Sequence, residues 1–313
     1  MFKTDFVWLS FKNFKDIKFR GRERPSNYPL ITILLFLSFC SVSNANKLSY
    51  DRNIAQWQEV AIPPWSDKGS RMVWDYAANY SELSWSVFKK DGQVLAQLNE
   101  EIVGNQSAHP NFTPLTKEFS GASTFFPVNN GWLIGFNHGE FGAALYWFSR
   151  NGRQHYKISN HQIVNFFITK EGIQAIEGLA HMGMSTGSVI RITRPKKNSR
   201  WHASTITQLP FAPLAISLKN DGVKLITLSD CLVSLDTENK VQTLLYFAPW
   251  DSFYPNSSVL SQDEQKLFIG MRQFVGEFDL NTKKLRLLVP SKEFLNKLPK
   301  DDEDRIRKTY GSE

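Results

Sequence analysis

Several side chains able to bind a metal ion or transfer a proton lie close together along this sequence. His138 and Glu140 are two positions apart across Gly139, and His181 follows Glu177 by four positions. Imidazole and carboxylate groups at such spacing can coordinate a metal ion or act as general acid and base. The same groups in long loops also hydrogen-bond the loop backbone, and this alternative stays open for each residue.

Three further candidates lie in the C-terminal half: Tyr254, Asn256 and Arg272. A guanidinium group binds a carboxylate or phosphate through two parallel hydrogen bonds. Arg272 follows an apolar run, so it either points into a central channel as an anion clamp or ties down a loop. Residues 183–187 match the Gly-x-Ser-x-Gly nucleophile pattern. That motif needs a strand-to-helix turn, whereas both flanks here have strand character, which indicates a chance match.

A repeat positions these residues. Phe148, Ile192, Leu235 and Phe278 end four similar apolar runs, separated by 44, 43 and 43 positions, and an earlier copy ends at Phe88. A period of about 40–45 residues built from short hairpins is typical of β-propeller blades. The sequence therefore predicts five blades.

A second unit, an apolar run, a tight turn and another apolar run, precedes each later hairpin. Turns such as Asn130-Gly131 and Asp221-Gly222 supply the positive φ that tight hairpins need. We predict an all-β fold, a β-propeller of four-stranded antiparallel blades over residues 46–290. Six blades are the alternative, because the stretch from Trp57 to Tyr80 is weakly patterned. The aromatic residues of the strands are expected to fill the core.

The two ends of the chain read differently from the repeat. Residues 1–29 carry seven Lys or Arg against three acids, and an uncharged, largely apolar stretch runs from Tyr28 to Ala45, ending in Ser-Asn-Ala. This order predicts a secretory signal peptide over residues 1–45, and hence a periplasmic or secreted protein. The apolar core is too short to span a bilayer comfortably, so no stable membrane insertion is expected after cleavage. Residues 291–313 predict a charged, partly helical tail.

Removal of the signal peptide changes the charge and the cysteine content. The formal net charge falls from +7 to about +3, and Cys231 becomes the single cysteine. A lone cysteine forms no intrachain disulfide, and no Cys-x-x-Cys pair is present to hold zinc. The basic run from Arg194 to Arg200 lies in an expected hairpin turn, which favours a solvated turn over a nucleic-acid surface. No nucleic-acid partner is expected.

The loops of a four-stranded blade emerge at two opposite ends. Those joining the second strand to the third, and one blade to the next, share one end, and here they carry most of the functional groups. Function tends to lie on loops held by a rigid scaffold. We therefore predict a ligand-binding surface at this end, formed by His138, Glu140, Glu177, His181, Tyr254, Asn256 and Arg272.

The last repeat resembles the gluconolactonase and regucalcin propellers. Tyr254-Pro-Asn256 stands at their Pro-Asn pair, and the turn from Ser261 followed by Lys266-Leu-Phe-Ile resembles their turn and strand. The resemblance covers about 25 residues, and it implies that Asn256 is a ligand of a divalent cation such as Ca²⁺. The family's Glu-Gly-Pro is absent after residue 46, and Gly270-Met-Arg stands where the family usually has Ala-Asp.

Three functions are compatible with these features. The first is an extracytoplasmic propeller that binds a protein or a small ligand over its loop-rich end. The second is a lactonase-like, metal-dependent hydrolase with Asn256 and Glu177 as ligands, joined by Glu140 or Asp230. The third is a periplasmic inhibitor or immunity protein. Convergence of several oxygens at one point favours the hydrolase, because hard divalent ions need such a set.

Overall fold

The computed structural model describes residues 49–101 and 108–311. The chain divides into two units, Met1–Lys47 and Leu48–Glu313, and every described element belongs to the second. The predicted signal peptide and its cleavage point after Ala45 lie outside the described residues. None of the described helices is long and apolar enough to cross a membrane.

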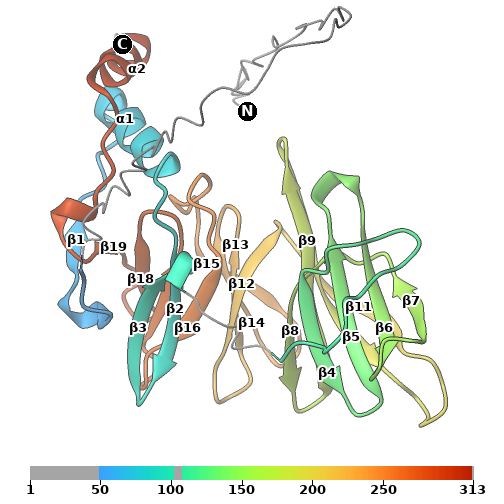
Figure 1. The fold of residues 1–313 in the computed structure, drawn as a ribbon. Helices are drawn as coiled ribbons and strands as arrows, with labels where there is room; N and C mark the ends of the chain where they lie inside the picture. The colour runs from blue at the N-terminus through green and yellow to red at the C-terminus, as the bar shows by residue number, and fades with distance from the viewer. Residues whose placement is uncertain (1–48, 102–107, 312–313) are drawn as a thin grey trace, which may run out of the picture. The chain divides into compact units, whose positions relative to one another are not determined.

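The second unit is a β-propeller of five antiparallel sheets, which confirms the predicted fold class (Figure 1). Strands that follow one another in the chain are neighbours within each sheet. The first sheet contains β2 (Trp85–Lys90) and β3 (Gln93–Leu98); the second β4 (Thr124–Val128), β5 (Gly131–Asn137), β6 (Ala143–Ser149) and β7 (His155–Ser159); the third β8 (Ile163–Thr169), β9 (Gly172–His181), β10 (Met184–Thr193) and β11 (His202–Leu209); the fourth β12 (Pro213–Leu218), β13 (Lys224–Leu228), β14 (Leu232–Leu235) and β15 (Val241–Leu245); the fifth β16 (Ser257–Leu260), β17 (Lys266–Gly270), β18 (Val275–Asp279), β19 (Leu285–Val289) and β1 (Gln58–Val60).

Apolar clusters join successive sheets. Alternate residues of a strand point to opposite faces, so each sheet can contribute to a cluster on either side. Leu145 and Ile190 belong to the cluster shared by the second and third sheets, and Trp250 and Phe278 belong to the one shared by the fourth and fifth. The predicted core role of the strand aromatics agrees with this packing: Phe148 and Phe278 are buried.

One face of the second sheet packs against a loop segment instead of a strand. Ile134, Phe136 and Phe148 lie on the face opposite Leu145, and Phe112 and Phe119 cover them. These two residues belong to the connection after the first sheet. Burial of aromatic rings from both sides holds this irregular segment in place.

The stretch from Trp57 to Tyr80 does not supply strands to the first sheet. Its residues form β1, which pairs with β19, and helix α1 (Lys68–Asn79). Pro63 and Pro64 end the extended segment, and the Asp67 side chain accepts a hydrogen bond from Ser70 N at 3.0 Å as an N-cap. The first sheet therefore has two strands and the fifth has five, a departure from four strands in every blade.

The outer strands differ in how their exposed edges are protected. The pairs β6–β7, β10–β11 and β14–β15 each contain a register shift, whereas β18–β19 pair without one. A bulge disrupts an edge and discourages further pairing. The regular edge of β19 is the one that β1 covers.

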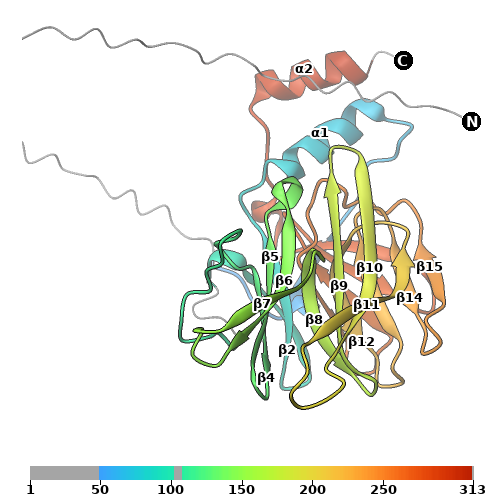
Figure 2. The same cartoon turned by 90° about the vertical axis from the view of Figure 1, so that its right-hand side faces the viewer.

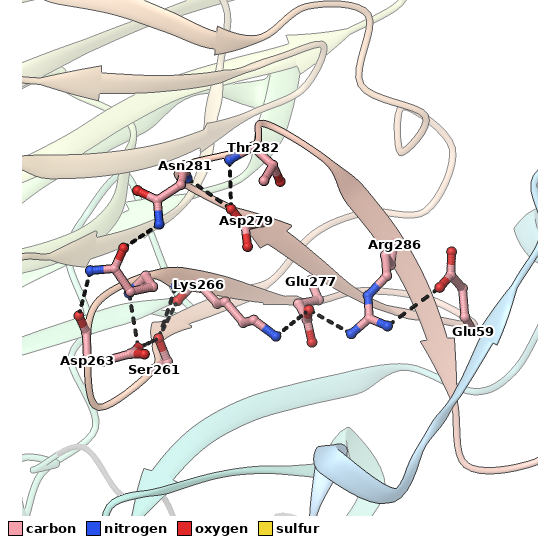
Figure 3. Close-up of polar contacts among 10 residues, drawn as sticks. Glu59, Ser261, Asp263, Lys266, Glu277, Asp279, Asn281, Thr282 and Arg286 are labelled. Carbon is pink, nitrogen blue, oxygen red and sulfur yellow. Dashed lines mark hydrogen bonds and ion pairs between the residues drawn. The ribbon is translucent and has the colours of Figure 1, made fainter.

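Ion pairs fasten β1 to the fifth sheet (Figure 3). Glu277 on β18 accepts from Lys266 Nζ at 3.0 Å and from Arg286 Nη2 at 2.7 Å, and Arg286 Nη1 lies 3.5 Å from Glu59 on β1. The hydrogen bond to Glu277 raises the pKa of Arg286, which therefore stays charged. The row of alternating charges crosses four neighbouring strands.

The second helix of this unit, α2 (Lys300–Tyr310), packs beside α1 (Figure 2). Arg307 Nη1 donates to Ser70 Oγ at 2.9 Å. Burial, and then a hydrogen bond to Tyr310, raise the pKa of Tyr76. Helix α2 belongs to the charged segment 291–313. Its contact with α1 connects this segment to the N-terminal part of the unit.

Candidate functional site

At the loop-rich end, seven connections join consecutive strands of the second to fifth sheets. They are 138–142, 160–162, 182–183, 210–212, 229–231, 246–256 and 271–274. The nine hairpin turns leave the sheets at the other end; Figure 1 shows the tip of the β9–β10 hairpin at the upper end of its sheet. All seven predicted site residues lie in or beside the loop-rich end, but the structure does not bring them together as one cluster.

The segment 177–187 is not the long loop that the sequence predicted. It forms the ends of β9 and β10, which pair from Ile173 to Ile192 around the two-residue turn Met182-Gly183. Both turn residues have positive φ, 46° and 83°, as in a type I′ hairpin. The Gly residues here suggested a loop, but backbone pairing outweighed their low strand propensity. No helix follows Ser185, so the Gly-x-Ser-x-Gly match has no elbow geometry.

Glu140 and His181, two of the predicted site residues, contact each other. Glu140 lies in the short 3₁₀ helix Gly139–Phe141, and its Oε2 is 2.5 Å from His181 Nε2 near the hairpin tip. His138 points elsewhere: its Nε2 lies 2.6 Å from Ser120 O, and its ring meets Phe119 edge-on. Glu140 and His181 thus link the second and third sheets, while His138 fixes the segment that covers the second sheet.

Glu177 is held within its own region. Its Oε1 accepts a short hydrogen bond from Ser188 Oγ, and Oε2 accepts from Gln162 N at 3.4 Å. The side chain of Gln162 donates to Asn137 Oδ1 at 2.7 Å and to Gly139 O at 3.2 Å. This carboxylate is therefore part of a hydrogen-bond network that joins the second and third sheets.

Asn256 belongs to a different network, beside the first sheet. Its Oδ1 accepts from Ser86 Oγ at 3.2 Å, and its Nδ2 donates to Ser84 Oγ at 3.3 Å. Asn99 Nδ2 also donates to Ser84 Oγ, at 2.9 Å. The amide of Asn256 fastens the innermost strand of the fifth sheet to the first sheet.

Arg272 ties down a structural element, the second of its two predicted roles. Its Nη1 donates to Asn79 O at 2.5 Å and lies 3.3 Å from Asn79 Oδ1, at the last residue of α1. The guanidinium carbon is 4.6 Å from the centre of the Tyr254 ring. A cation at a helix C-terminus is stabilised by the unpaired carbonyls and the helix dipole. The sequence offered no sign of this partner, which lies 193 positions away.

The residues proposed as metal ligands do not form a converged set. Asn256 and Glu177 are each bound by neighbours in separate hydrogen-bond networks, and Glu140 pairs with His181. Within residues 49–101 and 108–311, no group of three or more His, Cys, Asp or Glu side chains is arranged to hold a metal ion. The donor set that a hard divalent cation needs is not present in this arrangement.

Two carboxyl groups lie near each other at the same end. Ser229 Oγ donates to Asp230 Oδ2 at 2.6 Å and lies 2.9 Å from Ser185 Oγ. Partial burial, and then the negative charge of Asp230, raise the pKa of Asp251. The pair makes this part of the loop-rich end acidic.

Sequence reasoning missed the exposed apolar side chains of the loop-rich end. Phe247 is 95% exposed, Phe141 83% and Met182 77%. In and beside the seven connections, the exposed large apolar residues are Phe141, Met182, Met184, Tyr246, Phe247 and Tyr254. Met182, Phe247 and Tyr254 also have positive φ, which is unusual for large side chains. Tyr246-Phe247 directly after an apolar strand was the signal available in the sequence.

Comparisons with known proteins leave the family open. No family model matches the chain. No curated protein matches it either.

Three solved structures illustrate the partial similarity that exists. Virginiamycin B lyase from Staphylococcus aureus shares 13% identity at a TM-score of 0.37, covering 55% of this chain and 57% of that one. The extracellular domain of the putative one component system BT4673 from B. thetaiotaomicron shares 13% at 0.42, covering 69% and 28%. The Xanthomonas campestris gluconolactonase XC5397 shares 9% at 0.36, covering 53% and 57%. The chain spans less than two thirds of each, and the propeller assignment rests on its own sheets.

Proposed function

We propose that this protein is an exported β-propeller that binds a protein partner through its loop-rich end. The observation that carries the proposal is the set of exposed apolar side chains there, with Phe247 95% exposed. Exposed apolar and aromatic side chains at one end of a rigid scaffold can mark an interaction surface. Export rests on the predicted signal peptide over residues 1–45.

The nine hairpin turns at the opposite end provide an internal control. None of the large apolar side chains that are exposed among the described residues lies within those turns. Short connections of the same sheets close both ends. Packing of the sheets therefore does not require the two ends to differ in exposed apolar side chains. A role in contacting another molecule accounts for it.

The backbone of the loop-rich end supports a pre-formed surface. Phe247 and Met182 have φ values of 51° and 46°, conformations that large side chains adopt only when their surroundings impose them. Nearby, Trp250 is completely buried and donates through Nε1 to Leu228 O at 2.9 Å. A rigid surface loses little conformational entropy on binding, which favours affinity.

A protein partner accounts for these features better than the alternatives do. A lactonase-like mechanism needs a converged metal site, whereas Asn256 and Glu177 bind their own neighbours. The exposed side chains are spread over three connections and the start of β10, which suits a broad protein surface. An inhibitor or immunity role is one form of such binding and has no separate observation behind it.

The test is quantitative affinity capture of extracytoplasmic proteins from the source cell. The immobilised baits are wild type, Phe247→Asn and the control Ile168→Thr. Asn tolerates positive φ, and Ile168 is 62% exposed at the turn end. We expect one protein to be enriched by wild type and the control but reduced about tenfold or more with Phe247→Asn, as for an aromatic hot spot. Equal capture by all three baits contradicts the proposal.

A further inference from the structure

The cations of three neighbouring turns form a basic patch at the turn end. The turns β4–β5 (129–130), β6–β7 (150–154) and β10–β11 (194–201) contain six cationic residues and no acidic residue. The basic patch consists of Arg150, Arg153, Arg194, Lys196, Lys197 and Arg200. All are exposed except Arg194, which is half-buried.

Hydrogen bonds hold the three turns together. Arg150 Nη2 donates to Asn129 O at 2.6 Å, which joins the β6–β7 turn to the β4–β5 turn. With its carboxamide in the orientation that satisfies its neighbours, Asn130 Oδ1 accepts from Arg194 Nη1 at 3.1 Å. Trp201 N donates to Tyr156 OH at 2.8 Å. The β10–β11 turn is thereby fixed to both others, so the six charges share one surface.

Nothing among the described residues neutralises these charges by ion pairing. Other cations near this end have acidic neighbours, such as Lys219 with Asp221 at 3.2 Å and Arg191 with Glu171 at 3.5 Å. No ion pair between described residues includes a member of the basic patch. Six uncompensated charges on one surface attract a polyanion.

The aromatic residues beneath the patch indicate which polyanion fits. Trp147 and Tyr156 stack on each other at 5.2 Å, the Arg200 guanidinium carbon lies 4.9 Å from the Tyr156 ring, and Trp201 is buried. Proteins that bind single-stranded nucleic acid use free aromatic faces on which bases stack. These three rings pack on one another, on Arg200 or in the core, and the charges project from hairpin turns, where they can meet a flat surface.

We propose that the basic patch adsorbs to a bilayer surface rich in anionic phospholipid headgroups. Clusters of four to eight Lys and Arg residues near a membrane bind such headgroups electrostatically, without insertion. The turns and the loop-rich end lie at opposite ends of the strands, so adsorption through the turns leaves the loop-rich end directed away from the bilayer. Adsorption does not depend on what the loop-rich end binds.

Vesicle co-sedimentation of the purified protein tests this. The vesicles contain phosphatidylcholine alone or with about one third phosphatidylglycerol, at low and high salt. We expect binding only to the anionic vesicles, lost at high salt. Lys196→Glu/Lys197→Glu should weaken it about tenfold or more, because adsorption depends on each cation near the surface. The matched control, Lys283→Glu/Lys284→Glu in the β18–β19 turn, changes the net charge equally and should keep most binding.

Three results overturn the proposal. The first is no binding of the wild type to anionic vesicles, and the second is equal weakening by the two double variants, which would indicate net charge alone. The third is tight binding to a single-stranded oligonucleotide without vesicle binding, which would assign the patch to nucleic acid. Circular dichroism of both double variants checks that they remain folded.

Discussion

The two ends of the strands differ in both charge and apolar exposure. The seven connections of the loop-rich end contain three acids and one arginine, and the exposed apolar side chains lie in or beside them. The nine turns contain eleven cations, seven acids and no exposed large apolar residue, and the exposed apolar residues beside them are Ile168, Leu218 and Val241. The same antiparallel sheets reach both ends, so the fold does not impose the difference in charge and apolar exposure. We attribute it to the partners proposed for each end.

The acids of the turn end serve the backbone. Asp279 accepts from Asn281 N and Thr282 N, and Asp263 accepts from Gln265 N (Figure 3). Asp221 accepts from Val223 N in the same way. At the loop-rich end Asp230 and Asp251 lie near one another instead. Acidic side chains thus hold the turns at one end and form part of the surface at the other.

The largest expected effect comes from removing the anchor of the loop-rich end. Trp250→Ala should lower the free energy of unfolding by about 3–5 kcal/mol, because a fully buried indole leaves a cavity. Urea denaturation of wild type and variant measures it. Trp250→Phe keeps most of the volume and should cost less, about 1–3 kcal/mol for the unpaired Leu228 carbonyl. A cost below about 1 kcal/mol for Trp250→Ala would show that the loop is not anchored through this residue.

A second prediction tests whether Arg272 stabilises helix α1 or contacts the partner. Arg272→Ala should cost about 1.5–3 kcal/mol, because a charged donor to the last residue of α1 is lost. Hydrogen exchange should show faster opening of α1, with the sheets unchanged. Arg272→Lys keeps the charge and should recover part of the loss. If α1 exchanges as in wild type while partner capture fails, Arg272 belongs to the binding surface itself.

The repeat was readable from the sequence because each blade repeats the same local choices. Positive-φ turns and apolar strands recur at constant spacing, and Phe148, Ile192, Leu235 and Phe278 all lie on the third strand of their sheets. The first blade was not predictable in the same way. Pairing of β1 with β19 joins residues more than 200 positions apart, and no local pattern specifies such a partner.

The candidate site was only partly predictable, because side-chain partners come from distant segments. The loop-rich end could be named from loop content, and His138, Glu140 and Arg272 do lie there. That Arg272 meets α1, or that Asn256 meets Ser84, depends on contacts across more than 170 positions. Exposure is also a property of the folded state, so Phe247 was not distinguishable from the core aromatics by sequence pattern.

A third prediction uses pH to compare the acidic residues of the two ends. Hydrogen bonds from Thr282 lower the pKa of Asp279, whereas burial and Asp230 raise that of Asp251. A carboxyl group whose pKa is lowered by folding stabilises the folded state at pH values above its unfolded pKa, near 3.9, and this stabilisation is lost as pH falls. A carboxyl group whose pKa is raised by folding follows the opposite trend. Asp279→Asn should therefore destabilise the protein at pH 7, with the loss shrinking as pH falls through the lowered pKa, and Asp251→Asn should stabilise it slightly at pH 7.

Thermal unfolding of both variants from pH 3 to pH 7 measures these trends, on the order of a few degrees at most. The wild type at each pH is the reference. Parallel pH profiles for the two variants would mean that the acids of the two ends do not differ in role.

The smallest effect is also the sharpest test of the loop-rich end. Met182 occupies the first position of a type I′ turn at φ 46° and is followed by Gly183, so the turn would suit Asn-Gly better. Met182→Asn should therefore raise the free energy of unfolding by about 0.5–1 kcal/mol, since Asn tolerates this conformation. The same change removes a side chain that is 77% exposed, so it should weaken partner capture.

A gain in stability together with a loss of partner capture is expected for a functional surface, because a strained conformation there is retained for the contacts that it provides. The matched control is Lys283→Asn, another residue with positive φ, in a hairpin turn at the opposite end. It should stabilise to a similar degree and leave capture unchanged. If Met182→Asn stabilises the protein and capture is also unaffected, the hairpin tip lies outside the binding surface, and the exposed aromatic residues alone define it.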